Sequence, residues 1–369
     1  MKSGKTFMNH VGTIFCQLGK LLRKRTSRKA VLIIKDDGLG DLILWLPYQA
    51  EIRKYYPVEK YRIDLVVKSQ YIEFSALIPW VDRVLVIPDY RNRFHWTCFR
   101  LLFYLTHAYD IVCNITVSPH GMWYPYRYSN LVTMLLKDSV FENASKYFKN
   151  VVYTDRLNIR ERYQAVLKIL TGTSEVGNID YGIFKSSLEP VSKTYCVICP
   201  GAGDSRRCWE PEKYIQLIER ILSKWTGCAI LVGTAKERDL GEQIRMAGKY
   251  RNRIHNMCGD LSVSKMFTLI SRSCFLVSND TGTCHIGAAL GVKTFIICGQ
   301  GDYGSFVPYP EGMEGKQVFS IFSKRICRCQ LWGNEECRKQ SVYPCIAEIS
   351  ADEVWEVIKK HVVKIPEGI

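Results

Sequence analysis

The sequence of 369 residues predicts an α/β protein with two parallel β-sheets, each in a domain of its own. Three observations support this prediction. Short β-rich runs alternate with longer helical patterns from residue 30 onward, the series breaks at 182–193 and restarts, and the length allows two separate cores. Hydrophobic residues make up 47% of the chain and charged residues 24%, which excludes disordered, collagen-like and coiled-coil proteins. No apolar run approaches the roughly 18 residues of a membrane-spanning helix.

The first series begins with the run AVLIIK, which is typical of a parallel strand buried on both faces. A helix is expected directly after it, at 41–54. We expect the strands of this series at residues 30–35, 62–67, 83–87 and 110–115.

The second series repeats the alternation after the break. We expect its strands at residues 194–198, 229–232, 254–256, 274–278 and 293–297. We expect its helices at residues 212–224, 236–248 and 351–361. The last helix follows Ser350, a suitable N-cap, and Glu353 stands at the capping-box position.

Two such series indicate two Rossmann-like halves. Ligands of parallel sheets bind beyond the carboxyl ends of the strands, so a ligand cleft is expected between the halves. The predicted organisation is a leader at 1–29, a first Rossmann-like domain at 30–190, a second at 191–350 and a terminal helical segment at 351–369.

The leader is basic and amphipathic. The first 34 residues contain eight Lys and Arg and no acid, about half of the net charge of +15. Apolar residues between Phe7 and Leu22 recur every three or four positions, as on one face of a helix. Such a helix lies on an anionic membrane surface, or it packs on the protein itself or on a dimer partner. It lacks the continuous apolar centre and the cleavage site of a secretory signal.

Cysteine usage indicates the compartment. The chain has 15 cysteines, most of them isolated within apolar runs, which is typical of buried thiols in a reducing cytosol. Cys327, Cys329, Cys337 and Cys345 stand closer together, with spacing that indicates either a structural metal or disulfide cluster or ordinary reduced thiols.

The first motif, KDDGLGD, follows the strand at 30–35 and opens a helix. Gly38 and Gly40 allow a tight turn and a close approach to a phosphate or an acceptor. Asp41 in the first helical turn is a candidate general base or, alternatively, a helix-capping carboxylate. A dinucleotide fingerprint is incomplete here because Ile43 stands where the third glycine belongs.

The second motif, CPGAGDSRRCWEPE, runs from a strand end into a helix near Pro211. Backbone amides near Gly201 and the guanidinium groups of Arg206 and Arg207 suit a diphosphate. The alternative is a solvated basic loop.

The third motif, SNDTGTCHIGAA, also joins a strand end to a helix. The amides of Thr281 to Thr283, around Gly282, would form an anion site at the helix N-terminus, beside Asp280. His285 either contacts a ligand there or is an ordinary hydrogen-bonded helix residue. No metal-binding spacing accompanies it.

An aromatic and basic stretch lies between the strands of the first half. Its Arg91, Arg93 and Arg127 are candidates for binding an anionic acceptor. Nucleic acid is not expected as a partner, because no DNA- or RNA-binding signature is present.

Together the three motifs resemble those of glycosyltransferase family 9, the lipopolysaccharide heptosyltransferase family. The likeness rests on GLGD at 38–41, PGAGDSRRCW at 200–209 and NDTGTCHIGAALG at 279–291. It implies the GT-B arrangement of two facing Rossmann-like domains, with the acceptor on the first, the nucleotide-sugar on the second and the terminal helix crossing back. The family consists of metal-independent inverting enzymes, of which the best known extend the inner core of lipid A from ADP-heptose.

The resemblance also implies residue roles. Asp41 matches the base, and Arg207 occupies the place of a basic residue, usually Lys, that contacts the donor phosphates. Asp280, Thr281, Gly282 and His285 match the donor-binding block, and Glu237 matches an acid that contacts the nucleotide.

The resemblance further predicts that the protein needs no metal or cofactor besides an ADP-linked donor. It would act in the cytoplasm, at the inner face of the inner membrane, on a lipid-linked or phosphorylated glycan. Two alternatives stay open: a nucleotide-sugar epimerase or hydrolase of the same fold, and a non-catalytic binder of anionic glycolipid or nucleic acid.

Overall fold

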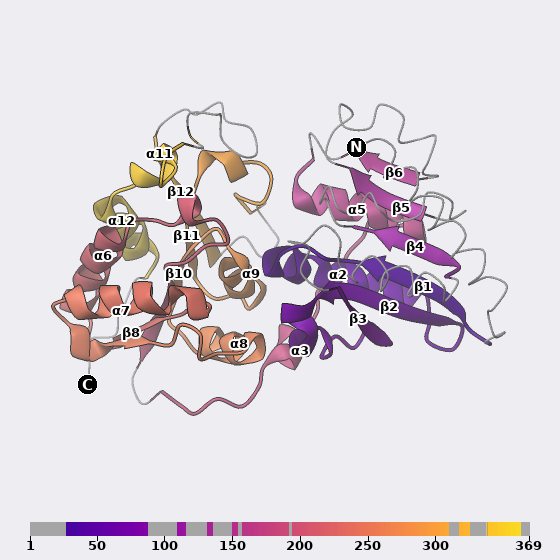
Figure 1. Ribbon diagram of the computed structural model, residues 1–369, viewed down its shortest axis with the longest axis horizontal. Helices are drawn as coiled ribbons and strands as arrows, with labels where there is room; N and C mark the ends of the chain where they lie inside the picture. The colour runs from indigo at the N-terminus through magenta and orange to yellow at the C-terminus, as the bar shows by residue number, and fades with distance from the viewer. Residues whose placement is uncertain are drawn as a thin grey trace. The chain divides into compact units, whose positions relative to one another are not determined.

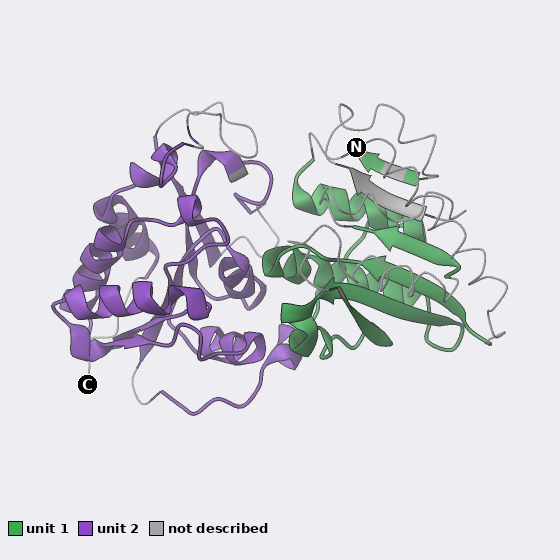
Figure 2. Ribbon diagram, in the orientation of Figure 1, with its two compact units in different colours: residues 1–180 green, residues 181–369 purple. Residues whose placement is uncertain are grey.

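The computed structural model describes residues 27–87, 109–115, 131–135, 150–153, 157–191, 194–309, 317–324, 337 and 339–362. The chain forms two compact units, Met1–Asp180 (unit 1) and Tyr181–Ile369 (unit 2) (Figure 2). The expected leader helix lies outside the described residues.

The boundary between the units precedes the expected one at 190/191. The segment after residue 180 belongs to unit 2 because its side chains and backbone are held there. The Phe184 ring centroid lies 5.6 Å from that of Phe267, and the Ser186 N–H donates to Thr268 Oγ1 at 3.0 Å.

Unit 1 contains a six-stranded sheet in the order β3-β2-β1-β4-β5-β6, with every pair of neighbours parallel (Figure 1). Its strands are β1 (Lys29–Ile34), β2 (Tyr61–Lys68), β3 (Arg83–Ile87), β4 (Ile111–Asn114), β5 (Leu131–Leu135) and β6 (Asn150–Tyr153). Its described helices are α2 (Leu39–Tyr55), η1 (Ser69–Tyr71), α3 (Ile72–Ser75) and α5 (Ile159–Thr171). The four expected strands are confirmed within one or two residues, and β5 and β6 were not predicted.

Unit 2 contains a second six-stranded parallel sheet, in the order β12-β11-β10-β7-β8-β9. Its strands are β7 (Tyr195–Cys199), β8 (Cys228–Leu231), β9 (Ile254–Asn256), β10 (Leu276–Asn279), β11 (Thr294–Cys298) and β12 (Val318–Phe322). Its longer helices are α6 (Pro211–Lys224), α7 (Arg238–Ala247), α8 (Val263–Ser271), α9 (Gly282–Ala289) and α12 (Ala351–His361). The shorter helical segments of unit 2 are η5 (Tyr181–Phe184), η6 (Ser205–Arg207), η7 (Ala235–Glu237), η8 (Arg251–Arg253), η9 (Gln300–Asp302) and α11 (Pro344–Ala347).

The two sheets share one strand order. Numbered along the chain within its own unit, each sheet has the order 3-2-1-4-5-6, the arrangement of the doubly wound Rossmann fold. In this fold the connections reverse between the first and fourth strands, and ligands bind beyond the carboxyl ends of the strands at that point. The reversal lies between β1 and β4 in unit 1 and between β7 and β10 in unit 2.

Helices cover both faces of the unit 2 sheet, with α6, α7 and α12 together on one face and α8 and α9 on the other (Figure 1). The capping box of α12 is confirmed, because Ser350 Oγ accepts from the Glu353 N–H at 3.2 Å and the Ser350 N–H donates to Glu353 at 2.8 Å. Val354 and Ile358 of α12 are fully buried in the unit 2 core. The crossing of the terminal segment back to the first domain stays a prediction.

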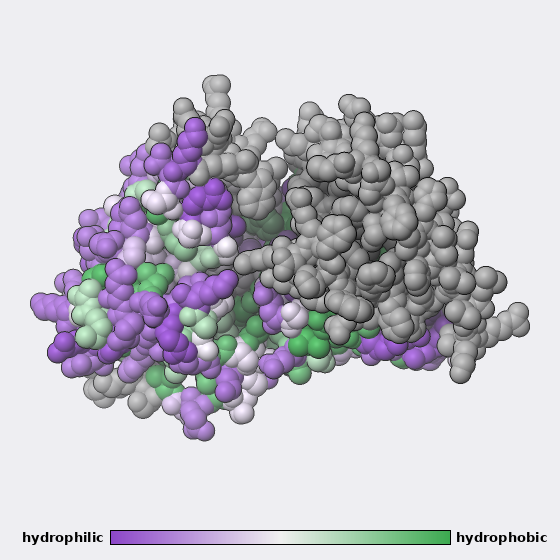
Figure 3. Space-filling model, viewed as in Figure 1, coloured by the Kyte–Doolittle hydropathy of each residue, from purple (hydrophilic) through white to green (hydrophobic). Residues whose placement is uncertain are grey.

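The surface of unit 2 seen in Figure 3 is mostly hydrophilic. Within the described part of the chain, no helix combines the length and hydropathy that crossing a bilayer requires.

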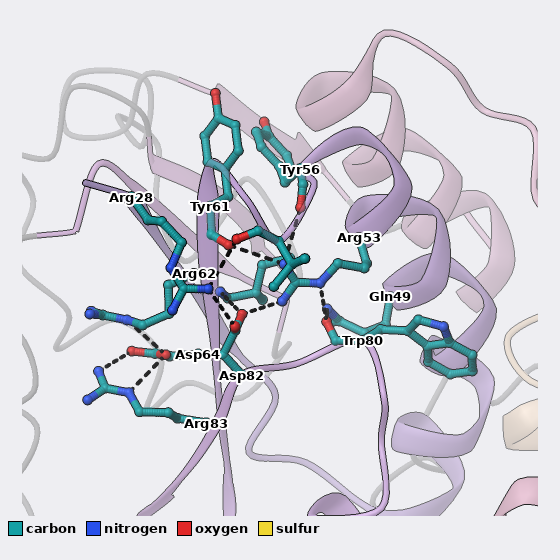
Figure 4. A network of polar contacts seen from close by, with 12 residues as sticks. Arg28, Gln49, Arg53, Tyr56, Tyr61, Arg62, Asp64, Trp80, Asp82 and Arg83 are labelled. Carbon is teal, nitrogen blue, oxygen red and sulfur yellow. Dashed lines mark hydrogen bonds and ion pairs between the residues drawn. The ribbon is translucent and has the colours of Figure 1, made fainter. Parts of the chain in front are cut away.

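A buried polar network stabilises the amino-terminal edge of the unit 1 sheet (Figure 4). The fully buried carboxylate of Asp64 in β2 accepts two bonds from Arg83, at 3.1 and 2.5 Å, and one from the Tyr109 hydroxyl at 2.7 Å. Arg62 lies 3.2 Å from the same carboxylate. The network occupies the edge opposite to the one where ligands bind, so we assign it to stability.

We expect Asp64→Ala to lower the free energy of unfolding by about 3 kcal/mol, because it leaves two arginines without their shared partner. This loss lies at the lower end of the range for breaking a buried ion pair, because the Arg83 side chain is 43% exposed. Chemical denaturation measures the loss. Asp260→Ala is the matched control: its pair with Arg238 is half exposed on both sides and contributes about 1 kcal/mol or less. Equal losses in the two variants would contradict this assignment.

Candidate functional site

The ends of β7 and β10 are joined by one buried side chain. Asn279 Nδ2 donates to the carbonyl oxygens of Pro200 at 2.8 Å and Gly201 at 3.2 Å, and Asn279 Oδ1 accepts from the Trp209 N–H at 3.2 Å. The loop after β7 is therefore fixed at the reversal point of unit 2. Asn279 belongs to the third motif, but this role was not predicted from the sequence.

Arg207 and Asp280 come from two separate motifs and meet at this point. Arg207 Nη2 donates to the Asp280 carbonyl oxygen at 2.6 Å and to its Oδ2 at 3.1 Å. The Asp280 side chain is 4% exposed, whereas that of Arg207 is 22% exposed. The pair therefore holds a guanidinium group, still partly open to solvent, where the fold binds ligands.

His285 continues this network into the interior. Its Nε2 lies 3.6 Å from Asp280 Oδ1, and its Nδ1 lies 2.5 Å from the Tyr309 hydroxyl. Asp280, Cys284 and His285 have potential ligand atoms within 4.8 Å of one another, a grouping that could hold a metal ion. Burial, reinforced by the Asp280 charge, raises the pKa of the Cys284 thiol well above its ordinary value. Without a metal Cys284 is thus a neutral thiol at neutral pH, and ligation of a metal would release its proton.

The N-terminus of α9 lies beside the same carboxylate. Thr281 is the N-cap, and its Oγ1 accepts from the Thr283 N–H at 3.3 Å. Of the three amides in the predicted anion site, that of Thr283 thus serves the cap. The anion site itself stays a prediction. Gly282 begins the helix, as expected for a close approach of backbone to a ligand.

Glu237 lies against the loop after β7. Its Oε2 accepts from the Thr234 N–H at 2.7 Å and from the Thr234 hydroxyl at 2.6 Å, which closes a capping box at η7. A Cβ on Gly201 would lie 2.5 Å from Glu237 Cγ, so only glycine allows the loop to approach so closely. The structure thus places Gly201 and Glu237 together.

Arg206 points elsewhere. Its Nε and Nη2 donate to the Asp204 carboxylate at 2.9 and 2.6 Å, and its guanidinium lies 5.3 Å above the Tyr343 ring. The two neighbouring arginines therefore have different partners, and only Arg207 contacts Asp280 among the described contacts of the pair.

In unit 1 the KDDGLGD motif follows β1, at the reversal point of that sheet. Gly38 is the N-cap of α2, and Asp41 lies in its first turn, as expected. Among the described residues, no hydrogen bond is made by the Asp41 carboxylate, and its place in the first turn fits both the general base and the capping alternative. Lys35 is fully buried, and its Nζ donates to Asp37 Oδ2 at 2.5 Å and to the Tyr163 hydroxyl at 2.8 Å.

Comparisons with known proteins agree with this geometry. Residues 163–329 match the model of glycosyltransferase family 9 (heptosyltransferase). The chain is 34% identical over 364 residues to lipooligosaccharide heptosyltransferase 2 of Haemophilus influenzae, covering 89% of this chain and 99% of that protein. The chain belongs to glycosyltransferase family 9. It is also 24% identical to lipopolysaccharide heptosyltransferase 1 of Pseudomonas aeruginosa, over 73% of this chain and 78% of the relative.

Solved structures confirm the predicted fold of this family 9 glycosyltransferase. The family 9 glycosyltransferase from Veillonella parvula matches with a TM-score of 0.69 at 16% identity, over 92% of this chain and 99% of that one. The E. coli heptosyltransferase WaaC with ADP-2-deoxy-2-fluoro heptose matches with a TM-score of 0.66 at 17% identity, over 90% and 99%.

Some predicted residues of this glycosyltransferase lie outside the described part of the chain. These are the acceptor candidates and two members of the cysteine cluster, namely Arg91, Arg93, Arg127, Cys327 and Cys329. Of the other two cysteines, Cys337 is half-buried, and Cys345 is buried in the unit 2 core, where its Sγ accepts from the Gln300 N–H at 3.4 Å. The metal or disulfide cluster stays a prediction.

The partners that position the predicted residues were not found from the sequence. Tyr309 on His285 and Tyr163 on Lys35 are distant in sequence and carry no local signal. Asp37 is different, because a second acid within the KDDGLGD motif was visible and no role was assigned to it.

Proposed function

We propose that this family 9 glycosyltransferase transfers a heptose from ADP-heptose to the core of a lipopolysaccharide or related lipid-linked glycan, with inversion and without a metal. The observation that carries the proposal is Arg207 held by Asp280 at the reversal point of unit 2, a cation where a diphosphate would bind. The names of the relatives support the sugar: two are heptosyltransferases of lipooligosaccharide or lipopolysaccharide, and one solved structure holds an ADP-heptose analogue.

The donor would bind to unit 2. Arg207 neutralises the diphosphate, the amides of Thr281 and Gly282 donate to its oxygens, and the dipole of α9 favours its charge. Glu237, beside Gly201 at the same edge, contacts the nucleoside, as the family resemblance implies.

In the proposed reaction Asp41 removes the proton of an acceptor hydroxyl. The acceptor oxygen forms a bond to the anomeric carbon from the face opposite the diphosphate, while the bond from that carbon to the diphosphate oxygen breaks. The bonding electrons leave with ADP, and Arg207 stabilises the charge that develops there. The proton stays on Asp41 until solvent removes it.

A thermal-shift screen against ADP, UDP, GDP and CMP, with and without EDTA, tests the donor class. We expect ADP alone to raise the unfolding midpoint, because a ligand at a hundred times its Kd stabilises the folded state by about 2.7 kcal/mol. EDTA should leave that shift unchanged. A shift with another nucleotide would refute the ADP assignment, and loss of the shift in EDTA would refute metal independence. RNA binding without any nucleotide shift would favour the non-catalytic binder.

The proposal also covers the place in the cell where the protein meets its acceptor. We propose that the protein acts at the cytoplasmic face of the inner membrane, where the basic residues of the leader bind anionic lipid. Deleting residues 1–25 should weaken sedimentation with vesicles containing anionic phosphatidylglycerol and leave the ADP thermal shift unchanged. Neutral phosphatidylcholine vesicles are the control. Equal sedimentation of the full and shortened chains with anionic vesicles would contradict the membrane role.

A further inference from the structure

Unit 1 holds a second acid beside Asp41. The Asp37 side chain is 17% exposed, and its Oδ2 accepts from Lys35 Nζ at 2.5 Å. Its other oxygen, Oδ1, is buried and has no hydrogen-bond partner among the described residues. Burying a carboxylate with one oxygen unpaired destabilises the folded state. Pairing with Lys35 alone therefore does not explain why an acid stands at this position.

A chain of hydrogen bonds links Asp37 to Asp41. Lys35 Nζ donates to both Asp37 and the Tyr163 hydroxyl, and that hydroxyl donates to the Asp41 carbonyl oxygen at 3.3 Å. The Asp41 carboxylate lies near the turn, since a Cβ on Gly38 would lie 3.3 Å from Asp41 Oδ2. Hydrogen bonds through Lys35 and Tyr163 thus connect Asp37 to the backbone that carries Asp41.

Charged and titratable groups from three elements face Asp37. Asp36, Lys35 and Asp41 belong to its own segment, Tyr163 comes from α5, and Tyr71 comes from η1, where it interacts with both Asp37 and Asp41. Burial raises the pKa of Asp37 to about 7, with Lys35 opposing the rise and Asp41 adding to it. Asp37 thus changes its charge near neutral pH.

We propose that Asp37 is a positioning residue for Asp41: in its ionised form it holds Lys35 and Tyr163 in place and so fixes the backbone that carries the base. The proposal rests on the proposed function, in which Asp41 is the base. With Asp37 ionised, Lys35 is paired with it and donates to the Tyr163 hydroxyl, which in turn donates to the Asp41 carbonyl oxygen. With Asp37 neutral, Lys35 loses its ionic partner, and the link that fixes the Asp41 backbone is weakened.

The test is the dependence of kcat/KM on pH, from 5.5 to 8.5, for wild type and Asp37→Asn. The kcat/KM of the wild type should rise about three- to tenfold through pH 7, because ionised Asp37 fixes the base in its productive position. Asp37→Asn should lose that rise and stay at or below the low-pH level of wild type. The exposed Glu59→Gln is the control and should keep the wild-type profile. A rise that persists unchanged in Asp37→Asn overturns the proposal, because a purely structural partner of Lys35 would lower activity equally at every pH.

If Asp37→Asn does not fold, the pH dependence of kcat/KM is measured with Asp37→Glu instead. It retains a carboxylate with a different reach, so the midpoint of the rise should move by about half a pH unit or more. An unmoved midpoint would overturn the proposal.

A measurement on the unliganded protein separates this proposal from the proposed function. A carboxyl whose folded pKa is raised binds its proton more tightly in the folded state, so stability falls as pH rises from about 4 to 7 and then levels off. Asp37→Asn removes this pH-dependent loss. The unfolding midpoint of the variant, relative to that of the wild type, should therefore increase as pH rises from about 4 to 7. If the difference between the unfolding midpoints of Asp37→Asn and the wild type does not change with pH, the proposal is overturned, even where sugar transfer is observed. If the wild type transfers no sugar, the proposed function and the role of Asp37 in it are both overturned. The difference in stability between Asp37→Asn and the wild type still measures the ionisation of Asp37 in that case.

Discussion

Asp41→Asn is expected to lower kcat for sugar transfer by about 10²–10⁴-fold, the usual contribution of a general base. The amide cannot accept the proton of the acceptor hydroxyl, so the attacking oxygen stays a poor nucleophile. Donor affinity should stay unchanged, because the residues assigned to the donor belong to unit 2. Single-turnover kinetics and an ADP binding titration measure the two quantities.

Glu59→Gln, in an exposed turn of the same unit, is the matched control for Asp41→Asn and should keep the wild-type rate. Near-normal turnover of Asp41→Asn would show that another group removes the proton. A loss of ADP binding in that variant would show that the assignment of donor and acceptor to the two units is wrong.

Arg207→Ala is expected to lower kcat/KM by about 10²–10³-fold, as for the loss of one preorganised group that stabilises transition-state charge. Its guanidinium is already held by two hydrogen bonds to Asp280, so little reorganisation accompanies binding of the diphosphate. Arg207→Lys should recover part of the loss, because it keeps the charge but not the planar fork. Initial rates over a range of ADP-heptose concentrations measure both variants.

Arg206→Ala is the comparison that the structure offers for Arg207→Ala. Arg206 is bound to Asp204 and lies over Tyr343, so its removal should cost far less activity. Equal losses in the two alanine variants would favour a diffuse effect of positive charge in the loop over a specific role of Arg207.

Much of the fold could be predicted because buried parallel strands are continuous apolar runs. The run AVLII of β1 and the run TFIIC of β11 are examples, and all residues of both runs are buried. The strands β5 and β6 escaped prediction because they follow an aromatic and basic stretch with no clear period. Helix α5 was not predicted, although its sequence carries local signals: a capping box of Asn158 and Glu161, and Gly172, whose φ is 82°, at its end.

The motifs of the site could be predicted because they occupy strand ends, where the doubly wound fold binds ligands. The sequence could not show which arginine of the pair turns toward Asp280, since both have the same chemistry and adjacent positions. Nor could it show that Tyr163, 128 residues beyond Lys35, completes the link between Asp37 and Asp41. The contacts of Tyr163 depend on how α5 packs against α2. The sequence of neither helix alone indicates that packing.

Sugar transfer is tested most directly by an assay with the full chain, ADP-heptose and a lipid A core acceptor that lacks heptose, read by mass spectrometry. We expect an acceptor heavier by one heptose, formed in EDTA and absent with Asp41→Asn. Release of ADP with free heptose and an unmodified acceptor would contradict it and favour a hydrolase. An isomerised donor with no ADP released would favour an epimerase.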